Sequence, residues 1–296
     1  MPFSSIAIIG FGEVGRIFAR DLRAGGLARI TAYDVRTVPP EEGVRFASSA
    51  VEAVSDADLV ICSVTAGSAI EALQAALPGL GHAPFVLDVN SVSPGTKQQA
   101  ERAVRAARGR YVEAAVMASV PPKGLATPMW LGGADAAAFI VAADGLGMDL
   151  RVYSDEVGGA SSVKMCRSIM IKGLEALTTE CMQTARHYGV EQQVMDSLGD
   201  TLPHEDWRKL ARYVISRALI HGKRRSEEVL EVAVTVREAG IPPIMSTAIA
   251  ERQALAAVQG TMLPAEIRNG TDLDALLDAL LAQRQALQAV SQQAAQ

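Results

Sequence analysis

The chain has few cysteines and aromatic residues, and its basic residues form no runs. Cys62, Cys166 and Cys181 are widely spaced without a C-x-x-C pair, which argues against a disulfide framework and against a zinc site. Aromatic residues make up 4% of the sequence, too few for the stacking platform that single-stranded nucleic acids need. The net charge is −5, so we expect neither nucleic acid nor an anionic membrane surface as a partner.

Long apolar runs are also missing. No stretch reaches the ~20 residues of a membrane-spanning helix, and the N-terminal MPFSSIAIIGFG lacks the basic segment of a signal peptide. We therefore expect a cytoplasmic protein that binds a small molecule. The histidines have no i, i+4 pairing and no acidic partner at ligand spacing, so no metal site is predicted at His82, His187, His204 or His221.

Short β-branched segments alternate with helical patterns from residue 6 to about residue 153. This alternation predicts a mostly parallel sheet with crossover helices, which is the Rossmann-type doubly wound α/β fold. We therefore assign residues 1–157 to a dinucleotide-binding domain. The expected strands are IAIIG, RITAYD, DLVICSV, PFVLDV, RYVEAAVM, TPMWLG and LRVYS.

The strand signal stops after Gly159, and the rest of the chain has helical spacing. A candidate helix of roughly thirty residues, from SSVKMCRS to ARHYGV, is long for a globular protein and links the two halves. Residues 158–296 are thus expected to form an all-α substrate and dimerisation domain. Because a small helical domain on a long helix commonly packs against a second subunit, we expect a homodimer.

The segment IAIIGFGEVGRIF places three glycines between the first strand and the first helix. Gly10 permits a tight turn, Gly12 lets the backbone approach a pyrophosphate, and Gly15 allows close packing of helix on strand. A P-loop is excluded because Arg16 and Ile17 follow where that motif needs Lys and Ser or Thr. The predicted cofactor-binding residues are Gly10, Phe11, Gly12, Glu13, Val14, Gly15, Asp34, Arg36, Val64, Thr65 and Asn90.

Asp34 ends the second strand 19 residues after Gly15, where a carboxylate can bind the ribose hydroxyls of the adenosine. Its charge repels a 2′-phosphate and favours NAD. Arg36, two residues later, attracts a 2′-phosphate and keeps NADP as the alternative.

Polar residues also follow two other strands. FVLDVNSVSPGT puts Asn90, Ser91 and Ser93 at the carboxyl end of a buried strand, either as ligand contacts or as turn and N-cap residues. Ser119 begins the loop SVPPKG, which is either an anion-binding loop or a connection stiffened by its prolines.

On the long helix, Lys164, Ser168, Lys172 and Glu175 share one face, because they are spaced by four, four and three residues. The face is either functional or the solvated side of the helix. Arg167 adds a like charge that lowers the pKa of Lys164 if both groups are partly desolvated.

The order of these motifs resembles the β-hydroxyacid dehydrogenase superfamily, which includes 6-phosphogluconate dehydrogenase and 3-hydroxyisobutyrate dehydrogenase, over nearly the whole chain. The motifs are GFGEVG, DVNSVSP, EAAVMAS and GGASSVKMCRS. The resemblance implies that Lys164 is the catalytic lysine and that Asn90 and Ser91 hold the substrate carboxylate. The predicted substrate-binding residues are Asn90, Ser91, Ser119, Ser168 and Arg167.

This sequence departs from the family pattern at some of the substrate positions. Ser168 stands where the family usually has Asn, and Met117, Ala118 and Ser119 replace Ser-Gly-Gly. The chain is also too short for the large C-terminal domain of 6-phosphogluconate dehydrogenase. It therefore resembles the branch with a compact helical C-terminal domain, in which the basic segment HGKRRSEE offers His221, Arg224 or Arg225 to the site.

These features together predict an NAD(P)-dependent oxidoreductase that interconverts a small hydroxy acid and its oxo acid, with Lys164 as general acid and base. Two alternatives stay open. The first is an imine reductase, which shares the architecture but typically has another residue at the lysine position. The second is a cofactor-sensing protein without chemistry, in which Lys164 positions the nicotinamide.

Overall fold

A computed structural model describes residues 3–27, 29–201 and 206–294. The chain forms two compact units. The first comprises Met1–Arg167 and Val234–Ile241, and the second comprises Ser168–Ala233 and Pro242–Gln296. The division of function predicted at residue 158 stays a prediction.

The described part of the first unit contains an eight-stranded sheet with the order β3-β2-β1-β4-β5-β6-β7-β8. Neighbouring strands are parallel except for β6 and β7. The seven expected strands are present, and β3, which has only three residues and no buried side chain, was not predicted. The bounds are β1 Ser5–Ile9, β2 Arg29–Tyr33, β3 Val44–Phe46, β4 Leu59–Cys62, β5 Phe85–Asp88, β6 Arg110–Val116, β7 Met129–Gly132 and β8 Leu150–Ser154.

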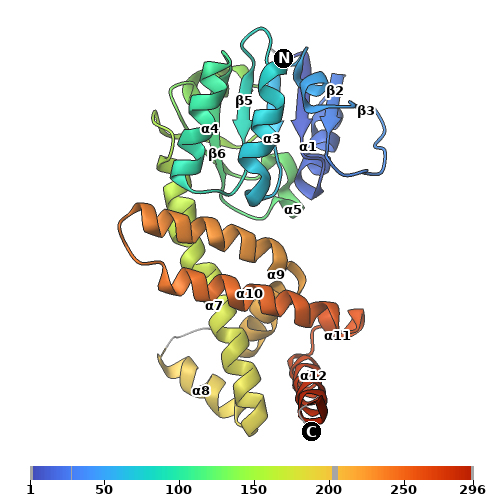
Figure 1. Cartoon of the computed structure of the whole chain (residues 1–296), viewed down its shortest axis with the longest axis vertical. Coiled ribbons are helices and arrows are strands. Elements are labelled where there is room, and N and C mark those ends of the chain that lie inside the picture. Colours follow the sequence, from blue (N-terminus) through green and yellow to red (C-terminus); the bar gives the residue numbers. More distant parts are fainter. Residues whose placement is uncertain (1–2, 28, 202–205, 295–296) are drawn as a thin grey trace. The chain divides into compact units, whose positions relative to one another are not determined.

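Helices cover both faces of the sheet, which is why its central strands are apolar on both sides. Ile6 and Ile8 of β1 share one core cluster with Phe18, whereas Ala7 and Ile9 share another with Leu73. Figure 1 shows α3 and α4 in front of the sheet. Residues of α1 Glu13–Ala24 and α6 Ala136–Ala142, together with Val120, belong to the first cluster. Residues of α2 Ala50–Val54, α3 Ala69–Ala76 and α4 Pro94–Ala106 belong to the second.

The strand order reverses at β1, which pairs with β2 on one side and with β4 on the other. In an open parallel sheet, this switch point leaves a crevice at the carboxyl ends of the strands, where dinucleotides bind. The loops after β1, β2, β4 and β5 are therefore the candidate cofactor-binding loops.

The second unit is helical, as predicted, and the long helix α7 Gly159–Tyr188 belongs to both units. Its core includes Met182, Ile215, Leu219 and Leu276. The other helices are α8 Glu191–Thr201, α9 Trp207–Glu238, α10 Ile244–Thr261, α11 Ala265–Asn269 and α12 Leu273–Ala294; the short α5 Val120–Lys123 lies in the first unit. The Rossmann-type sheet, the all-α region and the linking helix are all confirmed.

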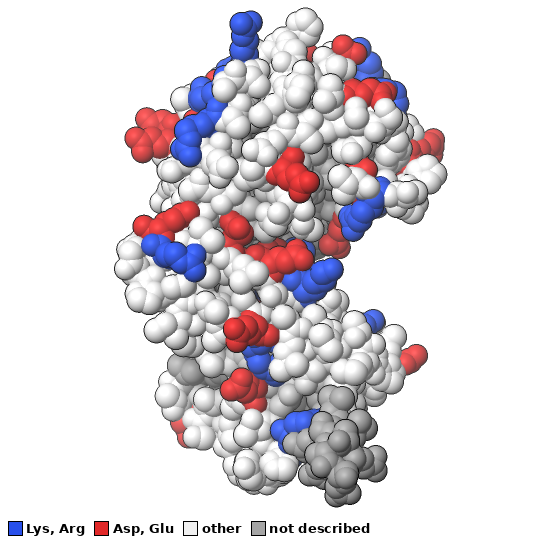
Figure 2. Space-filling model, in the orientation of Figure 1, with Lys and Arg blue, Asp and Glu red and all other residues white. Residues whose placement is uncertain are grey.

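Among the described residues, no helix combines the length and the apolar character needed to cross a bilayer. On the face shown in Figure 2, acidic and basic side chains are interspersed, and uncharged residues cover most of the area between them.

Candidate active site

The glycine loop has the geometry that its motif requires. Gly10 adopts a φ of 91°, and a Cβ there would lie 2.6 Å from the carbonyl oxygen of Ser63. A Cβ on Gly15 would overlap the carbonyl oxygen of Gly10. Side chains at these two positions would therefore push α1 away from β1 and β4. The Ser63 hydroxyl also donates a 2.9 Å hydrogen bond to Gly10 O and ties the loop to the end of β4.

Gly12 is placed differently, because a Cβ there would meet only Arg36 Nη2, at 3.9 Å. Gly12 is the N-cap of α1 and makes no side-chain cap hydrogen bond, so the first N–H groups of the helix are not satisfied by a capping side chain. Glu13 and Val14 form the start of this helix. An open backbone at a helix N-terminus fits a pyrophosphate. The residues present therefore fit an NAD cofactor.

Asp34 is linked to the same loop. Its Oδ2 accepts a 2.9 Å hydrogen bond from the Phe11 N–H, and its Oδ1 accepts bonds from the backbone N–H and the side chain of Arg36 at 2.9 and 3.3 Å. Burial opposes ionisation of Asp34, but these hydrogen bonds outweigh it and hold the pKa of its carboxyl below the usual value. Asp34 is thus an anion at neutral pH, with lone pairs left for a ribose hydroxyl.

These contacts predict the choice of cofactor. We expect the wild type to bind NADH more tightly than NADPH, and Asp34→Ala to narrow that preference by about tenfold, because the loss of a charged hydrogen-bond partner costs about 1.5–3 kcal/mol. Asp34→Asn keeps an acceptor without the charge and separates repulsion from hydrogen bonding. Arg36→Ala should weaken NADPH binding selectively. Fluorescence titrations measure both affinities; equal discrimination by wild type and Asp34→Ala would remove Asp34 from the selection.

The structure assigns different surroundings to the polar residues after β4 and β5. Val64 donates its N–H to the side chain of Asn90, and Thr65 is exposed at the start of a short turn. Ser93 is the N-cap of α4 and accepts a 3.1 Å hydrogen bond from the Thr96 N–H, as its N-cap interpretation predicts. Ser91 is half-buried.

Asn90 is almost completely buried, and its amide is largely used within the protein. Its Oδ1 accepts a 2.8 Å hydrogen bond from Val64, and its Nδ2 approaches Cys62 Sγ at 3.2 Å. These bonds connect the loops after β4 and β5. Ser119 lies in a different loop, after β6. It is exposed and occupies the N-cap position of α5.

The N-terminus of α7 is held by a carboxylate that was not among the predicted site residues. Glu113 of β6 is fully buried. Its Oε1 accepts hydrogen bonds from the N–H groups of Gly158 and Ala160 at 2.9 and 3.1 Å, and its Oε2 accepts one from the Ser161 hydroxyl at 2.9 Å. An anion at a helix N-terminus satisfies free N–H groups and interacts favourably with the dipole. Glu113 thereby fixes the first turn of the helix that carries Lys164.

Glu113→Ala should destabilise the protein by about 2 kcal/mol or more, because two backbone N–H groups and a hydroxyl lose a buried partner. Glu113→Gln is the matched control: its oxygen still accepts from Gly158 and Ala160, and its amide can donate to Ser161. Denaturant unfolding measures the free energy of unfolding of both variants and of the wild type. Equal stability of Glu113→Ala and wild type would contradict the capping role.

Lys164 itself is half-buried and, like the glycine loop, belongs to the first unit. Arg167 is exposed. The expected effect of Arg167 on the pKa of Lys164 required both groups to be partly desolvated, and the exposure of Arg167 does not meet that condition.

In the second unit, the rest of the polar face of α7 is buried, so it is not the solvated side of the helix. Ser168 and Lys172 are each 8% exposed, and Glu175 is 3% exposed. Lys172 Nζ lies 3.0 Å from Glu228 and donates a 3.2 Å hydrogen bond to Ser168. These side chains satisfy one another inside the helical unit.

The two arginines of the basic segment of α9 differ in burial. Arg225 is buried and its Nη1 pairs with Glu175, which also accepts a 3.2 Å hydrogen bond from Gln253. Burial raises the pKa of Glu175, and Arg225 opposes that shift. Arg224 is exposed and pairs with Glu228 at 3.2 Å. The guanidinium of Arg225 therefore has a structural partner, and Arg224 faces solvent.

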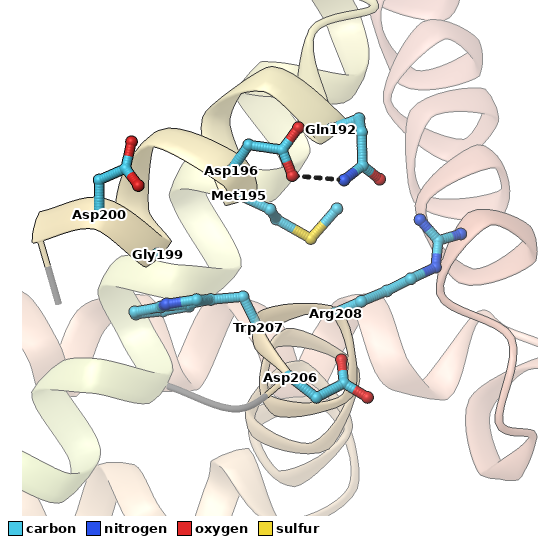
Figure 3. Close-up of a pocket in the computed structure, with 8 residues that line it drawn as sticks. All are labelled: Gln192, Met195, Asp196, Gly199, Asp200, Asp206, Trp207 and Arg208. Atoms are coloured by element: carbon cyan, nitrogen blue, oxygen red, sulfur yellow. Dashed lines mark hydrogen bonds between the residues drawn. The ribbon is translucent and has the colours of Figure 1, made fainter. Parts of the chain in front are cut away.

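The hollow in Figure 3 lies between α8 and the start of α9 and has a volume of about 410 Å³. Asp196, Asp200 and Asp206 contribute three carboxylates to its lining, and the single guanidinium, of Arg208, pairs with Asp274. No predicted site residue lines it. This lining does not suit a carboxylate substrate.

The described residues contain no group of three or more His, Cys, Asp or Glu side chains arranged to hold a metal ion. His204, one of the histidines considered above, lies outside the described residues.

Known families match both halves of the chain. Residues 5–143 match the NAD binding domain of 6-phosphogluconate dehydrogenase, and residues 185–256 match a domain of unknown function, DUF1932. The first match agrees with the glycine loop, Asp34 and the switch point described above. The protein thus has an NAD-binding domain.

Relatives extend the match over most of the chain. A conserved hypothetical protein from Sinorhizobium meliloti 1021 is 34% identical, with a TM-score of 0.72 and coverage of 94% of this chain and 96% of that protein. The conserved protein MTH1747, of unknown function, is described as structurally similar to 3-hydroxyacid dehydrogenases. It is 30% identical with a TM-score of 0.64, and the match covers 86% of this chain and 99% of that protein. The 3-hydroxyisobutyrate dehydrogenase of Pseudomonas aeruginosa is 23% identical over 206 residues, 66% of this chain and 68% of that enzyme. The chain therefore belongs to the β-hydroxyacid dehydrogenase superfamily, in the 6-phosphogluconate dehydrogenase-like branch with a compact helical C-terminal domain.

Proposed function

We propose that the protein is an NAD-dependent dehydrogenase that interconverts a small hydroxy acid and its oxo acid, with Lys164 as general acid and base. The observation that carries the proposal is the placement of Lys164. It lies on the helix whose first turn Glu113 ties to β6, in the compact unit that holds the glycine loop. NADP is the alternative cofactor, favoured by the exposed Arg36 beside Gly12.

In the proposed reaction, the cofactor, Lys164 and the polar side chains proposed to bind the substrate have separate roles. NAD held by the glycine loop and Asp34 would supply the hydride acceptor for oxidation, and its reduced form would supply the hydride donor for reduction. In oxidation, the neutral amine of Lys164 takes the proton of the substrate hydroxyl as the C–H bond breaks; in reduction, its ammonium form donates that proton to the carbonyl oxygen. Ser91 and Ser119 are the proposed hydrogen-bond donors to the substrate carboxylate, whereas Ser168 is buried in the second unit and accepts a hydrogen bond from Lys172. Asn90 acts mainly through the loops that it connects.

A panel of small hydroxy acids with NAD and NADP, and of the matching oxo acids with the reduced cofactors, tests this function by the absorbance of reduced nicotinamide. We expect turnover that depends on the acid and is faster with NAD. Reduction of cyclic imines without activity on hydroxy acids would identify an imine reductase instead. Tight NADH binding without turnover across both panels would identify a sensor.

We also infer that the second unit binds a second copy of the chain. Met170, Leu174 and Leu177 are exposed on α7 at helical spacing, and α10 exposes Leu255 and Val258. Exposed apolar rows of this kind indicate an interface, and symmetric dimers are the commonest assembly. Sedimentation of the wild type and of Leu174→Lys tests this arrangement. A cytoplasmic location stays a prediction.

A further inference from the structure

A buried polar assembly lies at the carboxyl end of β5. Asp88 ends the strand and is 1% exposed, as is Lys97 of α4. Lys97 Nζ lies 3.0 Å from Asp88 Oδ1 and donates a 2.8 Å hydrogen bond to the backbone oxygen of Asp88. The hydroxyl of Tyr111 on β6 donates to Asp88 Oδ2 at 2.7 Å. Burial, followed by the charge of Asp88, raises the pKa of Tyr111, which keeps this hydroxyl a donor.

The assembly continues through Asn90 to the neighbouring strand. The backbone N–H of Asn90 donates to Asp88 Oδ1 at 2.9 Å. Its side chain then bonds to the Val64 N–H and to Cys62 Sγ, as described above. Burial raises the pKa of Cys62 to about 12, so the thiol is protonated at neutral pH. One connected set of bonds thus spans α4, β6, β5 and the loop after β4.

Stability alone does not explain an ion pair at this position. Burying a lysine and an aspartate costs desolvation, and apolar side chains of similar volume commonly give equal or greater stability. What an apolar cluster cannot do is fix the direction of individual N–H groups. Here the bonds specify the backbone at Val64 and at Asn90, in the two loops that follow β4 and β5.

These two loops lie at the carboxyl ends of β4 and β5, where one half of a dinucleotide would bind. A dinucleotide lies across the carboxyl ends of the strands at the switch point, and Asp34 after β2 marks the adenosine half. The nicotinamide half would therefore meet the ends of β4 and β5. We propose that Lys97, Asp88 and Asn90 are positioning residues that hold Val64–Thr65 and Asn90–Ser91 in the arrangement that binds the nicotinamide ring.

Binding of NADH and of ADP-ribose to the intact protein, measured by calorimetry, tests this proposal. ADP-ribose has the adenosine, the pyrophosphate and a ribose but no nicotinamide. Lys97→Met should weaken NADH binding by about tenfold, the equivalent of one or two lost hydrogen bonds, and should change ADP-ribose affinity by less than about twofold. Arg102→Met, which removes an exposed cation from the same helix, should change neither affinity.

Asn90→Ala provides a second variant in case Lys97→Met does not fold, since it leaves the ion pair intact and removes only the link to Val64 and Cys62. It should show the same selective loss of NADH affinity. Parallel loss of both ligands, or unchanged NADH affinity in a folded variant, would overturn the positioning role. Since no hydroxy acid is used, failure here is distinguishable from failure of the proposed reaction.

Discussion

Replacing Lys164 with methionine should lower kcat for hydroxy acid oxidation by about 10²- to 10⁴-fold, the usual contribution of a general acid and base. The methionine side chain is similar in length but exchanges no proton, so the hydroxyl proton loses its acceptor while the hydride still has one. NADH binding should change little, because the glycine loop and Asp34 are untouched. Steady-state kinetics together with NADH titration separate the two effects.

Arg102→Met is the matched control, because Arg102 is an exposed cation in the same compact unit and lies outside the proposed site. It should retain wild-type kcat and KM. If Lys164→Met kept wild-type turnover with an intact fold, the proton would be carried by another group and the proposed mechanism would be wrong.

Replacing Arg225 with methionine should destabilise the protein by about 3–5 kcal/mol, the cost of leaving one partner of a buried ion pair alone. The side chains of Arg225 and Glu175 are 7% and 4% exposed. Burial already raises the pKa of Glu175, and the loss of Arg225 removes the largest opposing influence. A carboxyl with a raised folded pKa destabilises the fold most above that pKa, so the deficit should shrink as the pH falls from 7 towards the carboxyl range.

Denaturant unfolding at two pH values measures this effect. Arg224→Met is the control on the same helix: its side chain is 52% exposed, and an exposed pair contributes at most about 1 kcal/mol. The double variant Arg225→Met, Glu175→Met should recover most of the lost stability, because no buried charge is left unpaired. Equal stabilities of Arg225→Met and Arg224→Met would contradict the structural role assigned to this pair.

The predictions that succeeded depend on local sequence. The apolar strands, the glycine loop and Asp34 at the end of β2 are encoded within short segments, and the structure places them as expected. The strand β3 was missed because its apolar, charged, apolar alternation extends over only three residues, fewer than the four to eight that identify a strand from sequence.

The residues that were missed act through contacts between distant parts of the chain. Glu113 lies 45 to 48 positions before the groups it caps, and within RYVEAAVM it is only a charged residue in a predicted strand. Arg225 and Glu175 are 50 positions apart. A helical sequence gives Arg224 and Arg225 the same appearance, and only packing distinguishes the exposed guanidinium from the buried one.

The transfer of deuterium from labelled NADH tests the central claim most directly. The protein is incubated with a small oxo acid and NADH that carries deuterium at the transferable position of the nicotinamide, and the product is analysed by mass spectrometry and NMR. We predict deuterium on the carbinol carbon of a hydroxy acid, at a rate that falls in Lys164→Met. Oxidation of NADH without deuterium in the hydroxy acid, or no turnover with any oxo acid that the panel offers, would contradict the account.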